Sequence, residues 1–186
     1  EVCCHGYRWE EVFRKSEAEE RVDIARAVAS LQRTTGHRPV GWYSRYAPSP
    51  HTRRLLAEEG GFVYDSDSYA DDLPYWSEAA GKPWLVLPYT LESNDMKFWA
   101  NAAFATGTDF RQYLQDSLDV LWDEGAHVPK MMSVGLHLRI IGRPGRAKAL
   151  DDFIAYAKAK GGVWFARRID IATAWREQFP PPRPTR

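Results

Sequence analysis

Short apolar runs and longer stretches with a helical repeat alternate along this chain. The short runs are interpreted as buried strands, because each spans only a few residues and a helix needs ten or more. Residues 84–89 give the plainest example, since five of the six are apolar or aromatic. The predicted strands are residues 2–4, 39–43, 62–64, 84–89, 131–136 and 163–166.

Helices are predicted between these runs. The first follows Ser16, which has capping-box spacing to Glu19, and ends before Gly36. The clearest helix follows Thr108, which we expect to cap it, and ends near Gly125. The remaining helices are predicted from about residue 50 with Ser49 as the cap, over a segment with Ala147, Leu150, Ile154 and Ala157 on one face, and from residue 170 to about 179.

Regular alternation of strands and helices predicts the α/β class, with a parallel sheet and helices outside it. The pattern leaves open whether the sheet closes into a barrel. We expect one domain over residues 1–179 and a Pro-rich extended tail over residues 180–186. Because the chain starts without Met inside an apolar run, we also expect a barrel that lacks its N-terminal strands.

Composition narrows the possible partners. The 186 residues include 25 basic and 25 acidic ones, with no basic stripe, which argues against nucleic acid. No run approaches the roughly 20 apolar residues that span a bilayer, and the start lacks the regions of a signal peptide. We therefore expect a cytoplasmic protein without membrane contact. The adjacent Cys3 and Cys4 do not have zinc-site spacing and predict buried thiols.

Candidate chemistry lies just after the predicted strands, where ligands gather in parallel α/β folds. His5 and His137 are expected there as proton-transfer groups. Asp65 and Asp67 belong to an acidic cluster whose repulsion arginine, a metal or simple solvation could offset. The residues expected to bind substrate are Arg8, Trp9, Trp42, Tyr43, Arg45, Asp72 and Trp76.

Three arginines follow predicted strands in the same way as these candidate residues. Arg8, Arg45 and Arg139 suit a carbonyl, a carboxylate or a developing oxyanion, and salt bridges to the acidic cluster are the competing interpretation. The sequence leaves the two interpretations equal.

Taken in order, these segments resemble the polysaccharide-deacetylase, or NodB-homology, superfamily, and most of all its allantoinase branch. The resemblance implies a distorted (β/α) barrel that hydrolyses amide C–N bonds, and a homo-oligomer such as a tetramer. It covers nearly the whole chain. The segments that carry it are residues 4–9, 38–43, 52–55, 58–62, 71–76, 135–137 and 141–146.

Two positions depart from the superfamily pattern. In its metal-dependent members a His pair four residues apart helps to hold a divalent cation, whereas this chain has His5 and Trp9. Indole nitrogen only donates, so Trp9 cannot be a ligand, and we expect no metal and no cofactor. Leu138 stands where the resemblance leads us to expect proline, which affects the geometry of the loop more than its chemistry.

The resemblance implies metal-independent opening of a cyclic ureide such as allantoin, a small-molecule substrate of purine catabolism. In this hypothesis His137 protonates the leaving nitrogen, His5 positions substrate or water, and Arg8 or Arg45 binds the carbonyl oxygen. Asp65 or Asp67 could orient a histidine. A metal-dependent polysaccharide N-deacetylase and an inactive or binding-only barrel fragment are the alternatives.

Overall fold

The computed structural model describes residues 1–100 and 103–182. They divide into two compact units, one formed by Glu1–Pro88 with the described residues from Ala166 onward, the other by Tyr89–Phe165. The single domain expected over residues 1–179 stays a prediction. The predicted tail starts at residue 180, and its residues 183–186 lie outside the described ranges.

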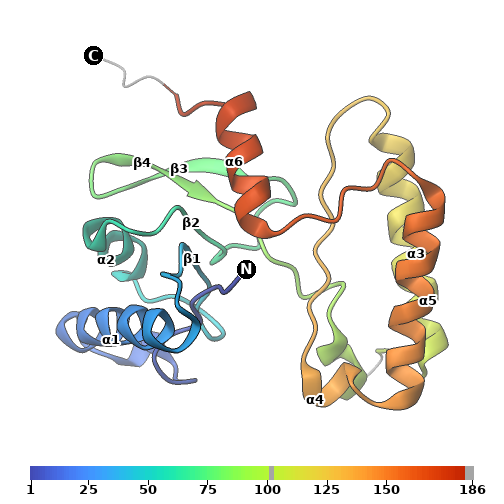
Figure 1. Cartoon of the computed structure of the whole chain (residues 1–186), viewed down its shortest axis with the longest axis horizontal. Helices are drawn as coiled ribbons and strands as arrows, with labels where there is room; N and C mark the ends of the chain where they lie inside the picture. The colour runs from blue at the N-terminus through green and yellow to red at the C-terminus, as the bar shows by residue number, and fades with distance from the viewer. Residues whose placement is uncertain (101–102, 183–186) are drawn as a thin grey trace. The chain divides into compact units, whose positions relative to one another are not determined.

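A four-stranded sheet forms the centre of the first unit, in the order β1-β2-β4-β3 (Figure 1). The strands β1 (Gly41–Trp42), β2 (Tyr64–Asp65) and β4 (Lys82–Val86) pair in parallel. Cys4 adds a parallel bridge to Trp42. The sheet confirms the mixed α/β class and the parallel pairing predicted from the alternation of elements.

The fourth strand, β3 (Tyr75–Ala79), was not predicted, and it pairs antiparallel with β4. Ala80 and Gly81 connect the two strands, and both have positive φ, at 51° and 71°. A two-residue turn with both φ values positive has the twist that a tight hairpin requires. The sequence pattern does not indicate β3, because its residues are mostly half-buried and form the outer strand of the sheet.

Three α-helices and the short η1 (Val12–Arg14) belong to the first unit: α1 (Glu17–Thr35), α2 (Thr52–Glu59) and α6 (Arg168–Gln178). The predicted capping box of Ser16 and Glu19 is present, and Gly36 ends α1 in the left-handed conformation. On its buried face α1 places Ile24 and Val28 in the same core cluster as Trp42.

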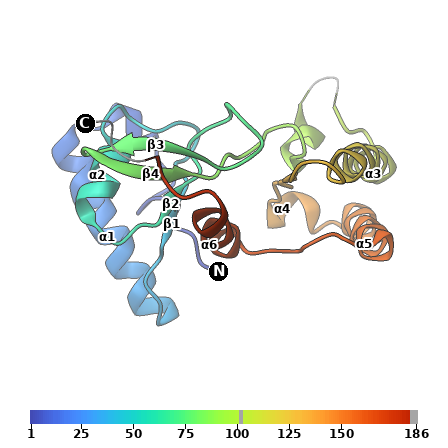
Figure 2. The same ribbon diagram turned by 90° about the horizontal axis from the view of Figure 1, so that it is seen from above.

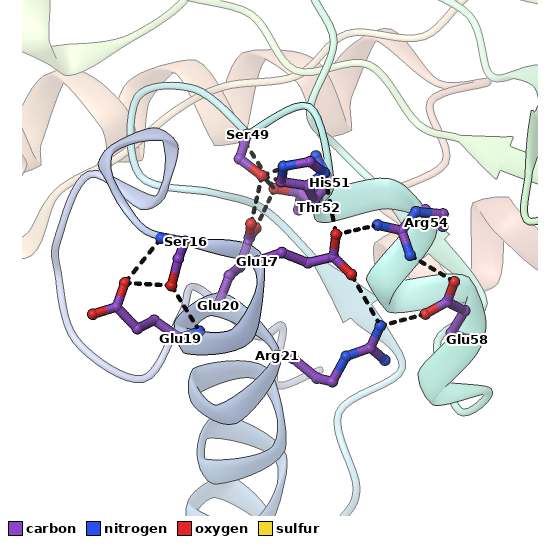
Figure 3. Close-up of polar contacts among 10 residues, drawn as sticks. All are labelled: Ser16, Glu17, Glu19, Glu20, Arg21, Ser49, His51, Thr52, Arg54 and Glu58. Carbon is purple, nitrogen blue, oxygen red and sulfur yellow. Dashed lines mark hydrogen bonds and ion pairs between the residues drawn. The ribbon is translucent and has the colours of Figure 1, made fainter.

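Polar contacts also join α1 to α2 and the loop before it (Figure 3). Glu20 is 1% exposed, and its carboxylate accepts hydrogen bonds from the hydroxyls of Ser49 and Thr52. The Ser49 hydroxyl also accepts from the backbone N–H groups of His51 and Thr52. The helix α2 begins at Thr52, and its N-cap residue is His51, which makes no side-chain cap hydrogen bond, so the prediction of Ser49 as the cap was wrong.

The second unit contains η2 (Asp95–Trp99), α3 (Gly107–Glu124), α4 (Leu138–Ile141) and α5 (Pro144–Lys160). Figures 1 and 2 both show α3 and α5 side by side. Their apolar faces meet around three aromatic rings, those of Phe98, Phe104 and Phe110, whose centroids lie 5.3 to 5.7 Å apart. This cluster is the core of the second unit.

Several local predictions for this region were wrong. Residues 131–136 and 163–166 form no regular strand, although Gly135 makes an isolated parallel bridge to Asn94. The cap of α3 is Thr106 rather than Thr108, because Thr106 and Asp109 form a complete capping box two residues earlier. The buried positions of α5 are Ala149, Phe153 and Ala157, so only Ala157 of the predicted face is fully buried. Among the described residues, no helix is long and apolar enough to cross a membrane.

Candidate active site

The parallel strands of the first unit bring three segments to one edge of its sheet. His5 follows the bridge at Cys4, Tyr43 to Arg45 follow β1, and Ser66 and Asp67 follow β2. Successive strands that run in parallel end at the same edge, so residues far apart in sequence become neighbours. We call these three segments the rim.

The imidazole of His5 is oriented by the segment after β1. Its Nδ1 lies 2.5 Å from the carbonyl oxygen of Tyr43, and its ring stacks on the Tyr43 ring with centroids 5.2 Å apart. A carbonyl oxygen only accepts, so Nδ1 carries the proton and Nε2 keeps a lone pair. His5 is exposed, and Nε2 can therefore accept a proton or a hydrogen bond from a ligand.

Arg45 is held at the rim by two aromatic rings. Its guanidinium carbon lies 4.0 Å from the ring centroids of both Trp9 and Tyr46, a double cation–π contact. Its Nε is buried and has no hydrogen-bond partner among the described residues. Its Nη1 lies 3.9 Å from Oε1 of Glu11. Tyr46 has a φ of 64°, an uncommon left-handed conformation for a non-glycine residue, which functional sites often contain.

Arg8 differs from Arg45 in its surroundings. Its side chain is 70% exposed, and its ion pair with Glu10 spans 3.8 Å. An exposed pair at this distance fixes a side chain weakly. Of the two arginines proposed for the carbonyl oxygen, Arg45 has the defined position.

Asp67 is joined to β1 through Ser44. Its two carboxylate oxygens accept from the Ser44 backbone N–H at 2.6 Å and the Ser44 hydroxyl at 2.7 Å, while that hydroxyl accepts from the indole of Trp42. Burial raises the pKa of Asp67 to about 7, against the opposing effect of the two Ser44 hydrogen bonds. Asp67 can therefore change its protonation near neutral pH.

Asp65 has a structural environment. It is 1% exposed and accepts hydrogen bonds from the Arg53 guanidinium at 2.7 and 3.2 Å, from the indole of Trp84 at 2.6 Å and from the backbone N–H of Asp67. These donors offset the negative charge of Asp65. Arginine was one of the three explanations predicted for the acidic cluster, beside a metal and solvation. The described hydrogen bonds of Asp65 join it to no histidine.

The remaining predicted substrate contacts lie in different surroundings. Trp42 is 1% exposed in the core, which corrects its expected contact with substrate, because the indole packs under the rim and supports Ser44. Tyr43 is half-buried, and its hydroxyl lies 2.7 Å from that of Tyr69. Asp72 is exposed in a turn, and Trp76 lies on β3, where its indole donates to the carbonyl of Phe179.

Sequence reasoning missed Arg168 at the same edge. From the first turn of α6, its guanidinium donates to the Ser66 hydroxyl at 3.0 Å and to the carbonyl oxygens of Leu87 and Pro88 at 2.8 and 2.6 Å. It thus joins the ends of β2 and β4. The pair Arg167-Arg168 gave only the signal of a charged helix start, which is common on protein surfaces.

In the second unit, His137 forms a pair with Asp95. Nδ1 of His137 lies 2.7 Å from one carboxylate oxygen of Asp95, and the other oxygen accepts from the His137 backbone N–H at 2.7 Å. Asp95 is 0% exposed, whereas the His137 side chain is 30% exposed. The carboxylate fixes the Nδ1–H tautomer and leaves Nε2 available to a ligand.

The backbone around this pair requires a glycine. Asp95 N–H donates to the Gly135 carbonyl, and Gly135 N–H donates to Ser93. A Cβ on Gly135 would lie 2.2 Å from Nδ2 of Asn94 and 2.3 Å from the hydroxyl of Tyr89. No pattern in the sequence indicates that the polar residues of segment 93–95 are buried. The aspartate that orients a histidine is thus Asp95 rather than Asp65 or Asp67.

Arg139 lies in the same unit as this pair, on α4. Its guanidinium carbon is 5.6 Å from the centroid of the Trp99 ring, a loose cation–π contact.

A divalent metal does not fit the donor set at the rim. His5 offers one nitrogen, and Trp9 offers an indole N–H that cannot bind a cation. Asp65 is already satisfied by Arg53 and Trp84. In the part of the chain that the structure describes, no three His, Cys, Asp or Glu residues are grouped so that they could hold a metal ion.

Comparison with known proteins identifies the family. No family model matches the chain. A Schizosaccharomyces pombe protein that carries a polysaccharide deacetylase name is 38% identical, with 97% of this chain and 61% of that protein covered. A Pseudomonas aeruginosa PAO1 structure described as a probable polysaccharide deacetylase is 54% identical with a TM-score of 0.91, over 97% of this chain and 60% of that one.

A third relative is a crystal structure of Puue allantoinase. It is 52% identical, has a TM-score of 0.91, and the alignment covers 97% of this chain and 60% of that one. The chain thus spans about three-fifths of the length of these relatives. At this identity and structural similarity, over nearly all of its own residues, the chain belongs to the polysaccharide deacetylase superfamily.

Proposed function

We propose that this protein is a hydrolase of non-peptide C–N bonds that opens a cyclic ureide such as allantoin without a metal. The observation that carries this proposal is the pair of His137 and the buried Asp95. Hydrolysis of an amide requires a proton on the departing nitrogen, and a histidine oriented by a buried carboxylate is suited to deliver it. The allantoinase relative supports the choice of substrate.

In the proposed reaction, water adds to a ring carbonyl and gives up a proton, a tetrahedral oxyanion forms, and the ring C–N bond breaks as the departing nitrogen takes up a proton. His137 in its protonated form donates to the leaving nitrogen, and Asp95 stabilises the imidazolium. In the first unit, Arg45 is a fixed cation of the rim that suits a carbonyl oxygen or an oxyanion. In the same unit, Nε2 of His5 is available to water or substrate.

Activity assays on purified protein treated with a chelator test the proposal. We expect allantoin to be converted to allantoate at an undiminished rate. His137→Ala should lower kcat by roughly 10² to 10³ with a smaller change in KM, the usual cost of removing one acid–base group. The matched control is His127→Ala, which removes an exposed histidine of the same unit and should leave kcat unchanged.

Arg45 is tested in the same assay. Arg45→Gln should reduce kcat/KM by about 10² to 10³, since one donor to the oxyanion is lost. Arg33→Gln removes an exposed cation in the last turn of α1 and serves as its control. Full activity of Arg45→Gln would exclude the guanidinium from the reaction.

The names of two relatives favour a second candidate, a metal-dependent polysaccharide N-deacetylase. It predicts release of acetate from N-acetylated oligosaccharides, loss of that activity under chelation and its return with added zinc. Stoichiometric metal in the purified protein, together with intact allantoin, would support this candidate and contradict the first.

A further inference from the structure

The second unit contains a pocket of about 400 Å³ between the first turns of α3 and α5. Four cationic side chains and one carboxylate line it: Arg111, Arg143, Arg146, Lys148 and Asp152. Three of these cations lie in or beside the segment of residues 141–146 that the family resemblance singled out. The proposed hydrolysis gives this segment no role.

The cations of the pocket exceed what its carboxylate can neutralise. Lys148 already forms an ion pair with Asp152, whereas Nη1 of Arg111 lies 3.8 Å from Asp152, beyond hydrogen-bond distance. The Arg111 Nε is buried and has no hydrogen-bond partner among the described residues. No described carboxylate is within ion-pair distance of Arg143. The pocket therefore carries more positive than negative charge, which favours an anion.

The two helices add positive potential at the same place. A Cβ on Gly107 would lie 2.7 Å from the carbonyl oxygen of Gly145, so α3 and α5 begin side by side. They also end side by side, since the Trp122 indole donates to the Gly161 carbonyl. The helices are therefore parallel and their N-termini lie together, although the Asp109 carboxylate offsets the partial positive charge of α3. The start of α5 has no side-chain cap.

We propose that this pocket binds a phosphate group, either inorganic phosphate or the phosphate of a small phosphomonoester. Guanidinium groups bind phosphate oxygens through paired N–H donors, and helix N-termini supply further backbone donors. The pocket has room for more than a lone phosphate ion. It is also open beside Gly145, where an added Cβ would meet no atom within 4 Å.

Isothermal titration calorimetry at constant ionic strength tests this site on the purified protein. Inorganic phosphate and ribose 5-phosphate are the two probes, with chloride and ribose as their respective controls. We expect saturable binding of phosphate, and tighter binding of ribose 5-phosphate if the natural ligand is a phosphomonoester. Equal affinity for the two probes would identify the free ion as the ligand.

Variants at the pocket test whether its residues bind the phosphate. Arg143→Gln should weaken phosphate binding by about 10-fold, since a charge-assisted contact is lost. Gly145→Glu places a carboxylate in the open space and should abolish binding. Lys158→Gln, in the last turn of α5, is the matched control and should bind like the parent protein.

The proposal is overturned if phosphate does not bind at all, or if Gly145→Glu binds phosphate as tightly as the parent. It is also overturned if chloride at equal ionic strength gives the same heat. Arg143 and Gly145 are both exposed, so their variants are expected to fold, and circular dichroism checks this. The outcome is independent of ureide hydrolysis, because none of these residues has a role in that reaction.

Discussion

His137 is held through two hydrogen bonds to a single carboxylate, one from its ring and one from its backbone N–H. Because Asp95 is fully buried, water does not compete for these bonds. The same carboxylate therefore sets both the tautomer of the ring and the position of the backbone that carries it.

Asp95→Asn tests this arrangement while preserving the shape of the side chain. An amide cannot accept from both the ring and the backbone and also balance an imidazolium. We expect ¹⁵N NMR to show a single Nδ1–H tautomer in the parent protein and a mixture in the variant, with a kcat loss of at least about 10². Asp116→Asn on α3 is the exposed control. An unchanged tautomer would contradict the assigned role of Asp95.

Asp67 predicts a pH dependence of stability. Burial raises its pKa from 3.8 to about 7, so the folded protein holds this proton more tightly than the unfolded chain does. The resulting stability is complete below about pH 4 and is lost as the pH rises through 7.

Asp67→Asn should remove that dependence, because the amide does not titrate. The free energy of unfolding from urea titrations between pH 4.5 and 8 is the measurement. We expect the parent protein to lose about 1 to 3 kcal/mol more than the variant across this range, with solvent screening allowed for. Parallel curves for the two proteins would show that Asp67 titrates normally.

At the scale of elements, the docking of α1 on α2 depends on a buried acidic side chain. Glu20 accepts from two hydroxyls inside the interface, while Glu17 and Glu58 form an ion-pair network with Arg21 and Arg54 at its edge (Figure 3). The contacts of Glu20 are buried and the ion-pair network lies nearer the surface, so the two should contribute differently to the free energy of unfolding.

Glu20→Ala should destabilise the protein by about 2 to 4 kcal/mol, because the hydroxyls of Ser49 and Thr52 lose their buried acceptor and a void remains. Glu17→Ala removes a partly exposed carboxylate of the same helix and should cost much less stability than Glu20→Ala. Thermal and urea unfolding of both variants measure the difference. Equal losses would mean that the exposed network carries as much weight as Glu20.

At the scale of the whole molecule, each unit has its own hydrophobic core. The cluster around Phe110 contains only residues of the second unit, and the cluster around Leu56 only residues of the first. A substitution in one core removes no packing contact from the other.

Phe110→Ala should therefore cost about 3 to 5 kcal/mol within the second unit, the usual effect of truncating a buried aromatic side chain. Hydrogen exchange resolved by segment is the measurement. Amides of α3 and α5 should lose protection, and those of α1 and α2 should keep theirs. The reciprocal variant Leu56→Ala should reverse this pattern. Equal loss of protection in all four helices would show a single cooperative core.

The sequence by itself determined what depends on neighbours along the chain. The capping box of Ser16 and Glu19, the C-terminal Gly36 and the alternation of strands and helices are local signals, and the first unit contains them. The placement of His5 just after the first strand segment, and the family, also followed from contiguous motifs.

Only the tertiary structure decided which polar residues are buried together. Asp95 meets His137 across 42 positions, Arg168 meets Ser66 across 102, and Trp42 lies in the core although its neighbours reach the rim. The antiparallel β3 and the pocket between α3 and α5 were likewise decided only by the tertiary structure. Burial and the direction of a side chain depend on the packing of distant segments, and local periodicity carries no information about that packing.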